Sequence, residues 1–426
     1  MAGPLLHSDA SSSRRRWFVA VVVFAVLATV IATAAHYRQN YSGELAFPVP
    51  DARSGYSKDL QVKDFIKPQG VKIIGFVFFG RKSRVEILRC FLEVSYPSRS
   101  PCNYTEFLTP IQRNLVDNGG WLDEIHWVKN TGKKEDLAYL QEIVDSSPRY
   151  KVIELKGVGF EGYGHAWGKL ERGNLYVKID DDVVWFADDT IPRIVSMKVA
   201  HPEYLTVSAN VINSPLMGWV HYHMGAMHPY LPEFDVYEPP LLDTLPNPSA
   251  RKPWRYNQYP DWTGPDDYFF DPFQDPPYDG HRWLRIPNNN ALHRTPVVDI
   301  EYKTWGTGLK SWAIAAQEHY SFLENLANNR LDVYKMGKAW ITDYRRLSIN
   351  FIAIMADDVL DNLPMDTVDE EWLTINLPKK LGRSVAVETD ALAVHFTFGT
   401  QGKVEKTDLL PRYHDYALEN ACARRV

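Results

Sequence analysis

Apolar segments of strand length, alternating with amphipathic helical segments, are the feature that most constrains how this chain folds. The first, residues 71–79 (VKIIGFVFF), is closed by Gly80, and a later one is residues 175–179 (LYVKI). Continuous apolar runs of this length are typical of strands buried on both faces of a sheet. The predicted elements are strands at 71–79, 125–128, 150–155 and 175–179 and helices at 83–94, 106–117 and 135–144. This alternation predicts an α/β fold, a three-layer α/β/α domain with a mostly parallel sheet.

Three adjacent carboxylates, Asp180, Asp181 and Asp182, follow the strand at 175–179. Ligands of such sheets bind beyond the carboxyl ends of the strands, which is where these residues lie. Side chains alternate along a strand, so Asp180 and Asp182 should project to one side and Asp181 to the other. Two carboxylates on one side predict a hard-oxygen site for Mn²⁺ or Mg²⁺, which would neutralise charge on a departing nucleotide diphosphate. The alternative is an exposed acidic turn or helix start.

The N-terminus has the pattern of a membrane anchor. Arg14, Arg15 and Arg16 precede an apolar run at 17–35, which as a helix would span roughly 28 Å, close to the hydrocarbon thickness of a bilayer. The arginines favour a cytosolic tail (1–16), a single transmembrane helix (17–35) and a luminal remainder. The alternative is a signal peptide cleaved near the small residues Ala32, Ala34 and Ala35.

The segment after this run is predicted to be a stem, residues 36–69, which is polar and contains three prolines. Asn103 and Asn40 begin N-glycosylation sequons, which suit a luminal glycoprotein. Three cysteines, Cys90, Cys102 and Cys422, allow at most one internal bridge. A Cys90–Cys102 bridge and three unbridged cysteines are both compatible with the sequence.

The luminal domain is predicted to occupy residues 70–426, with a proline- and aromatic-rich insertion at 229–287. So many prolines exclude long helices and central strands from the insertion. Its aromatic side chains suit either an acceptor region that stacks carbohydrate or the packing of irregular loops. The net charge of −6 argues against a nucleic-acid partner.

An anchor, a stem, a first strand ending in Phe78-Phe79-Gly80-Arg81 and the mid-domain Asp180-Asp181-Asp182 resemble Golgi type II glycosyltransferases of the GT-A fold. The likeness is greatest to fungal members with KIDDDVV segments, and it covers most of residues 71–420. The resemblance implies a metal-dependent transferase in the Golgi or ER membrane with a luminal catalytic domain. It further implies that a sugar passes from a nucleotide-sugar donor, such as a UDP-sugar, to a glycan or glycoconjugate acceptor with inversion.

Carried over to this chain, the resemblance makes Asp182 the principal metal ligand, Asp181 a supporting residue, and Asp180 a neighbour of the metal or the donor ribose. It places the nucleotide near Phe79, Gly80 and Arg81. A late histidine completes the metal site in many such enzymes, and the apolar segment 391–396 contains His395. The alternative for His395 is a buried histidine that hydrogen-bonds to backbone.

The general base of an inverting transferase has three candidates, Asp369, Glu370 and Glu371. Thr367 and Glu370 also have the spacing of a helix capping box, which is the structural alternative. A further group, His221, His223 and His228, has no cysteine to complete a zinc site, and packing or acceptor contacts explain it better.

Two other functions compete with glycosyl transfer. The segment 179–184 (IDDDVV) also fits the signature of haloacid-dehalogenase-like phosphatases, with Asp180 as nucleophile and Asp182 as general acid. Asp357, Asp358 and Asp361 would then form the late acidic motif of that class. However, that signature normally opens its domain, whereas here several βα units precede it. The second competitor is a non-catalytic glycan-binding membrane protein.

Overall fold

The computed structural model describes residues 64–92, 114–156, 160–234 and 254–422. The predicted tail (1–16), anchor (17–35), most of the stem, both sequons and Cys102 lie outside these ranges. In the described part of the chain, no helix combines the length and hydropathy that crossing a bilayer requires.

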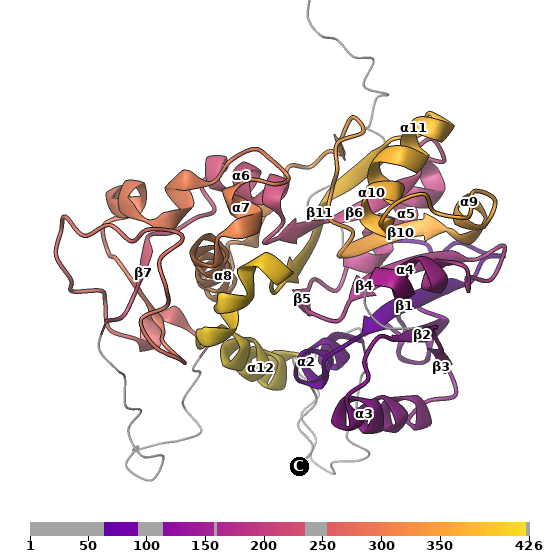
Figure 1. The fold of residues 1–426 in the computed structure, drawn as a ribbon, viewed down its shortest axis with the longest axis horizontal. Helices are drawn as coiled ribbons and strands as arrows, with labels where there is room; N and C mark the ends of the chain where they lie inside the picture. The colour runs from indigo at the N-terminus through magenta and orange to yellow at the C-terminus, as the bar shows by residue number, and fades with distance from the viewer. Residues whose placement is uncertain (1–63, 93–113, 157–159, 235–253, 423–426) are drawn as a thin grey trace, which may run out of the picture. The chain divides into compact units, whose positions relative to one another are not determined.

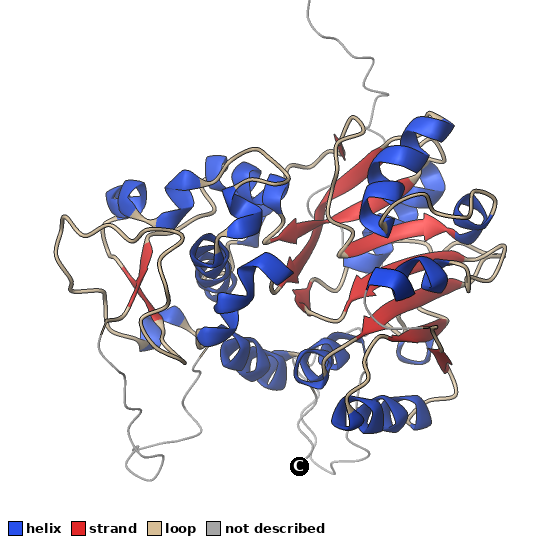
Figure 2. Cartoon of the chain, viewed as in Figure 1, coloured by secondary structure: helices blue, strands red, loops and turns tan. Residues whose placement is uncertain are grey.

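A nine-stranded sheet organises the domain, in the order β3-β2-β1-β4-β10-β6-β11-β5 with β9 paired to β11 (Figures 1 and 2). Its strands are β1 (Ile73–Phe79), β2 (Glu124–Lys129), β3 (Tyr150–Ile153), β4 (Leu175–Asp180), β5 (Val183–Phe186), β6 (Thr206–Ile212), β9 (Trp340–Ile341), β10 (Phe351–Met355) and β11 (Val385–His395). β1 to β4, β6 and β11 run in one direction, and β5, β9 and β10 run against them. The structure is therefore a mixed α/β fold with a mostly parallel sheet, as the alternation predicts.

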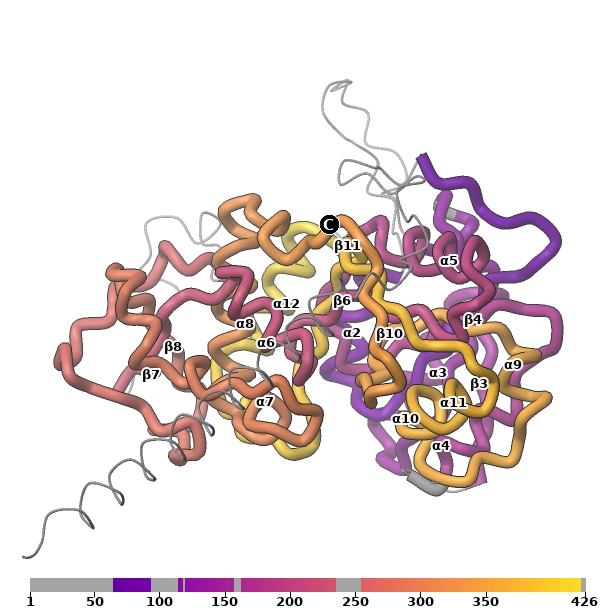
Figure 3. The backbone as a smooth tube through the Cα atoms, turned by 90° about the horizontal axis from the view of Figure 1, so that it is seen from above, coloured from indigo at the N-terminus to yellow at the C-terminus, as the bar shows by residue number. Residues whose placement is uncertain are grey.

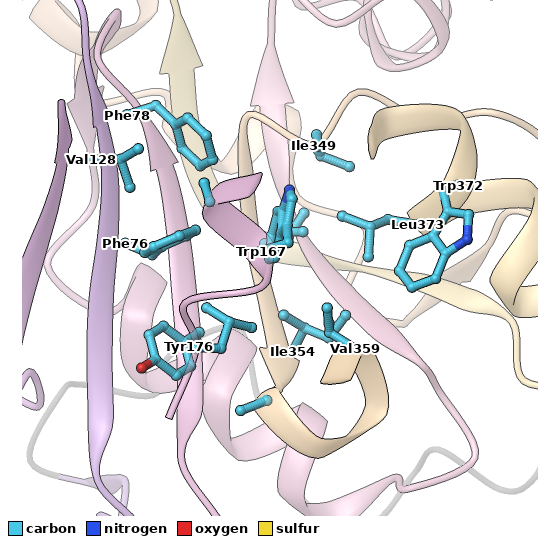
Figure 4. Packing of buried hydrophobic residues seen from close by; sticks show 14 of the residues in the cluster. Phe76, Phe78, Val128, Trp167, Tyr176, Ile349, Ile354, Val359, Trp372 and Leu373 are labelled. Carbon is cyan, nitrogen blue, oxygen red and sulfur yellow. The ribbon is translucent and has the colours of Figure 1, made fainter. Parts of the chain in front are cut away.

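Helices cover both faces of this sheet. They are α2 (Lys82–Leu92), α3 (Lys134–Asp145), α4 (Phe160–Trp167), α5 (Thr190–Ala200), α9 (Ala356–Leu360), α10 (Asp369–Glu371), α11 (Leu377–Leu381) and α12 (Leu409–Asn420). On one face, Trp167 of α4 and Leu373 pack over Phe76, Tyr176 and Ile354 in a continuous apolar cluster (Figure 4). On the other, Phe79 packs against Trp127 and Tyr139 of α3, and α5 lies along β6 and β11. β1 and β4 are parallel neighbours in the sheet, which places their carboxyl ends at one edge.

The segment between β6 and β9 forms a part of its own beside the sheet. It contains α6 (Pro215–His223), β7 (Tyr230–Pro232), β8 (Trp283–Arg285), α7 (Thr307–Lys310) and α8 (Trp312–Ala327). α6 and α8 lie between the β7–β8 pair and β11 (Figures 1 and 3). The described residues of the predicted insertion form only short strands and single turns, because proline supplies no N–H to a helix or a central strand.

The cysteine pairing differs from the Cys90–Cys102 alternative. Cys90 of α2 forms a disulfide with Cys422, just beyond α12. The two residues are 332 positions apart in the sequence, and they meet because α12 packs against α2. A Cys90–Cys102 bridge is therefore wrong, and so is the alternative in which all three cysteines are unbridged.

Candidate active site

An acidic turn between β4 and β5 forms the centre of the candidate site. β4 ends at Asp180, Asp181 and Asp182 make the turn, and β5 begins at Val183. β11 pairs with β5 at His395–Val183, and the Phe396 amide donates a hydrogen bond of 2.8 Å to the Asp182 carbonyl. The end of β11 therefore lies beside the turn, although the two segments are far apart in the sequence.

Asp180, Asp182 and His395 converge. One potential ligand atom from each of them lies within 4.8 Å of the others. His395 Nε2 is 3.1 Å from Asp182 Oδ1, and both side chains are buried. His395 Nδ1 is buried and has no hydrogen-bond partner in the described part of the chain. Two carboxylates and an imidazole at this separation form a donor set that fits a divalent cation such as Mn²⁺.

Asp181 is not among the three converging residues and contacts the end of β1 instead. Its carboxylate accepts hydrogen bonds from the Gly80 amide (3.2 Å) and from Nε and Nη2 of Arg81 (3.1 and 2.7 Å). A Cβ at position 80 would lie 3.0 Å from Asp181 Oδ2, so glycine permits this close approach. The structure thus places Asp181 in a link between the ends of β1 and β4, not among the three converging ligands.

Cationic side chains balance the three carboxylates. Asp180 pairs with the buried Lys178 and accepts a 2.8 Å hydrogen bond from Asn350 Nδ2. Asp182 lies 3.1 Å from Arg81 and 3.2 Å from the fully buried Arg84. Burial by itself raises the pKa of Asp182, but His395 and the two arginines outweigh it and hold that pKa well below its usual range. Asp182 is therefore a permanently ionised group.

Phe79, Gly80 and Arg81 occupy the edge where a nucleotide is expected, but in different ways. The Phe79 side chain is fully buried against Trp127 and Tyr139, so it is not available to a ligand. The Arg81 side chain is 40% exposed and is the part of this group that a bound phosphate can reach. The side chain of Phe79 is thus a core residue, because β1 alternates faces and position 79 falls on the α3 side.

The acidic trio on α10 lies close to the turn. Asp369 accepts a 3.1 Å hydrogen bond from Trp167 Nε1 and a 2.9 Å bond from the Glu370 amide. Glu370 forms a 3.0 Å ion pair with Arg346. Lys178 and Asp180 act electrostatically on the carboxyl groups of both Asp369 and Glu370. Glu371 has no resolved contact with this group, so Asp369 and Glu370 are the members that the fold brings to the site.

Glu370 has the electrostatics of an acid–base group. Its pKa is raised to about 7, chiefly by burial and also by Asp369 and Asp180, against the opposing effect of Arg346 and Lys178. Burial likewise raises the pKa of Asp369. The capping-box alternative is wrong, because the residue before α10 is Val368, which makes no side-chain cap. The Glu370 carboxylate pairs with Arg346 instead. The chain continues from α10 into a π-helical turn at Trp372–Asn376, a feature often found beside functional sites.

Sequence reasoning missed four of the residues that surround the carboxylates, namely Lys178, Arg84, Asn350 and Arg346. The sequence pattern indicates Lys178, because it lies two positions before Asp180 and therefore on the same face of β4. The pattern also indicates Arg84, because it lies three positions after Arg81 at the start of a predicted helix, and residues with this spacing are neighbours on a helix surface. Asn350 and Arg346 precede β10, which pairs with β4 only in the folded chain.

The histidines at 221, 223 and 228 contact groups other than the acidic turn. His221 Nε2 lies 2.8 Å from Asn210 Oδ1, and His228 Nε2 lies 2.9 Å from Asn325 Oδ1, both in buried surroundings. His223 is exposed on α6 and bonds through Nδ1 to the carbonyl of Trp219. These contacts match packing and hydrogen-bonding roles.

The acidic motif at 357–361 lies at the end of the β4 and β10 strands that is opposite to the acidic turn. β10 is antiparallel to β4, so Phe351 pairs with Ile179 beside the acidic turn, and Met355 pairs with Leu175 at the far end. Asp357 there binds Arg172 and the Gly173 amide, and Asp358 binds Arg383. This motif and the acidic turn cannot share a phosphatase site.

Comparisons with known proteins do not assign this chain to a family. No family model and no curated protein matches the chain. One similar solved structure is a 4-diphosphocytidyl-2C-methyl-D-erythritol synthase from Anaerococcus prevotii, with a TM-score of 0.22, 13% identity and coverage of 33% of this chain and 56% of that one. Another is a mannosyltransferase from Pyrobaculum calidifontis in complex with GDP-Man and Mn²⁺, with a TM-score of 0.23, 18% identity and coverage of 35% of this chain and 40% of that one.

Proposed function

We propose that this protein is a metal-dependent glycosyltransferase that moves a sugar from a nucleotide-sugar donor to a hydroxyl of a glycan or glycoconjugate. One observation carries the proposal. Asp180, Asp182 and His395 converge at the carboxyl edge of a mostly parallel sheet, within electrostatic reach of a second pair of carboxyl groups, Asp369 and Glu370. A cation site next to a carboxyl group with a pKa near neutrality suits this chemistry.

The converging residues would hold Mn²⁺ in preference to Mg²⁺. Carboxylates suit both ions, whereas an imidazole ligand favours a transition-metal ion. When bound, the cation neutralises negative charge that develops on the departing nucleoside diphosphate. Arg81, partly exposed beside Asp181 and Asp182, supplies a further positive charge at the same edge.

The proposed reaction is a displacement at the anomeric carbon of the donor sugar. The acceptor oxygen forms the new bond to that carbon as the bond to the diphosphate oxygen breaks, and the bonding electron pair leaves with the nucleoside diphosphate. The acceptor proton passes to the Glu370 carboxylate. Glu370 suits this role better than Asp369, because Trp167 and the Glu370 amide already hold the Asp369 carboxylate. A base opposite the leaving group gives inversion at the anomeric carbon.

The location of the protein and the nature of its donor and acceptor are further parts of the proposal. The arginine-flanked apolar run at 17–35 supports a single-pass type II protein of the Golgi or ER membrane. A luminal domain agrees with the Cys90–Cys422 disulfide, since disulfides persist in oxidising compartments. A UDP-sugar is the proposed donor, and the insertion at 229–287, which exposes Phe234, Phe269 and Phe273, is a proposed region for the distal part of the acceptor.

The test is a donor screen on the purified full-length chain, with binding measured by calorimetry and donor hydrolysis measured with and without Mn²⁺. Asp182→Asn is the informative variant, and Asp279→Asn is its matched control, because Asp279 is 80% exposed in a surface pair with Lys406. We expect one nucleotide sugar to bind and to be hydrolysed only with Mn²⁺, and Asp182→Asn alone to lose this activity.

Other outcomes would favour a different function. A chain that binds glycans but no nucleotide sugar under any metal condition would be the non-catalytic glycan-binding protein. Metal-dependent hydrolysis of p-nitrophenyl phosphate without donor binding would favour a phosphatase, against the separation of the two acidic motifs.

A further inference from the structure

Trp305 is a large apolar side chain that the fold leaves 59% exposed. It lies in the loop before α7. The guanidinium of Arg346 stacks on its indole ring, 4.0 Å from the ring centroid. One face of the ring is thus covered by a cation, and the exposed remainder faces solvent. An exposed tryptophan held by stacking retains little side-chain freedom, so a ligand that covers it loses little entropy in doing so.

The loop that carries Trp305 is fixed to the segment next to the acidic turn. The Thr304 hydroxyl donates a 3.1 Å hydrogen bond to the Arg346 carbonyl. Within the loop, the Lys303 amide donates to the Glu301 carbonyl and the Gly306 amide to the Lys303 carbonyl. These bonds make the position of Trp305 a property of the fold.

Arg346 connects Trp305 to the proposed base. The same guanidinium that stacks on the indole forms the 3.0 Å ion pair with Glu370. Arg346 also lies only four residues before Asn350, which donates to Asp180. A chain segment of that length spans at most about 14 Å, so Trp305, Glu370 and the cation site belong to one neighbourhood.

We propose that Trp305 is the platform for the acceptor sugar, with the apolar face of a pyranose ring stacked on the indole face that Arg346 leaves free. Arg346 is the positioning residue, because its guanidinium contacts both the Trp305 indole and the Glu370 carboxylate and so fixes their relative positions. The ring carbons of a pyranose present C–H groups on one face, and their burial against an indole is favourable. This inference rests on the proposed transferase function and names the acceptor class: a free or terminal pyranose.

The experiment uses the full-length chain with its donor and Mn²⁺, and a panel of methyl hexopyranosides as acceptor probes. The variants are Trp305→Ala, Trp305→Phe as the conservative replacement, and Val199→Ala as a control at an exposed apolar side chain of α5 (48% exposed). We expect Trp305→Ala to raise the acceptor KM roughly tenfold or more and to shift turnover from transfer to hydrolysis. Donor hydrolysis without acceptor should be unchanged, Trp305→Phe should retain most of the affinity, and Val199→Ala should behave as the wild type.

Three results would overturn the inference alone: an acceptor KM in Trp305→Ala equal to that of the wild type, an equal rise in Val199→Ala, or a wild-type chain that hydrolyses its donor but glycosylates no methyl hexopyranoside. If the wild-type chain shows no metal-dependent donor binding or hydrolysis, that result would instead contradict the proposed function itself, and with it the acceptor platform.

Discussion

His395 Nε2 lies 3.1 Å from Asp182 Oδ1, with both side chains 4% exposed, although one residue ends β11 and the other follows β4. The contact joins the C-terminal part of the chain to its central acidic turn. Asp180 completes the group, and each of these residues offers a ligand atom within 4.8 Å of the others. Because the three come from the ends of strands in one rigid sheet, their separation is set by the fold and not by a mobile loop.

Replacement of His395 should weaken metal binding. We expect His395→Ala to lower Mn²⁺ affinity by about 10–100-fold or more, because a ligand and its buried pairing with Asp182 are both lost. The change should be smaller for Mg²⁺, which prefers oxygen ligands. Free Mn²⁺ measured by electron paramagnetic resonance during titration gives both affinities by competition. His223→Ala is the control, since His223 is exposed and contacts the Trp219 carbonyl. Equal Mn²⁺ affinities for His395→Ala and the wild type would exclude His395 as a ligand.

The activity of the enzyme should depend on pH through Glu370. A general base must be ionised, and burial raises the pKa of Glu370 to about 7. We therefore expect kcat/KM for transfer to fall about tenfold per pH unit as pH drops below 7. Glu370→Gln should lower transfer by about 10²–10⁴-fold and abolish this dependence. Glu371→Gln on the same helix should retain both the rate and the profile; a large loss in Glu371→Gln with little in Glu370→Gln would assign the base to Glu371.

Stability should also vary with pH, through a carboxyl group outside the site. Glu318 of α8 is fully buried, its Oε2 accepts the Asn213 amide at 2.9 Å, and burial raises its pKa to about 8. Between the ordinary value of 4.5 and 8, the folded state keeps a proton that the unfolded state has lost. Stability therefore falls as pH rises through this window.

Glu318→Gln mimics the protonated carboxyl group and tests this effect. We expect its melting temperature to exceed that of the wild type by at least ~2 °C at pH 8.5 and to converge with it near pH 5. Differential scanning calorimetry across pH 5–9 measures this, with Glu86→Gln as a control because that side chain is 40% exposed. A constant difference between Glu318→Gln and the wild type at every pH would show that the buried charge is not responsible.

The disulfide should stabilise the attachment of α12 to α2. The Cys90→Ala/Cys422→Ala double variant should lose about 2–4 kcal/mol of unfolding free energy, measured by denaturant titration. Reduction of the wild-type chain should give a comparable loss, and reduction of the double variant should give little. Peptide mapping without reductant should recover a Cys90–Cys422 linked peptide. Recovery of a Cys90–Cys102 peptide in its place would contradict the pairing.

Much of the local structure follows from residue patterns over a few positions. The strand at 71–79 forms as β1 (Ile73–Phe79), and the helix at 135–144 forms as α3 (Lys134–Asp145). The apolar run 175–179 ends in Asp180, and Lys178 and Asp180, two positions apart on β4, form an ion pair on one side of the strand. Strand formation and side-chain alternation depend on adjacent residues, so they can be read along the chain.

The partners of those residues were decided only by the tertiary structure. The pairing of Cys90 with Cys422, the ion pair of Glu370 with Arg346 and the burial of Phe79 on the α3 face all join segments distant in sequence. Strand order and helix docking determine such contacts, and no local pattern encodes them. The sequence by itself determined the acidic turn and the strand that presents it. The fold decided which histidine, which arginines and which carboxyl groups surround that turn, because those distances depend on the packing of the whole sheet.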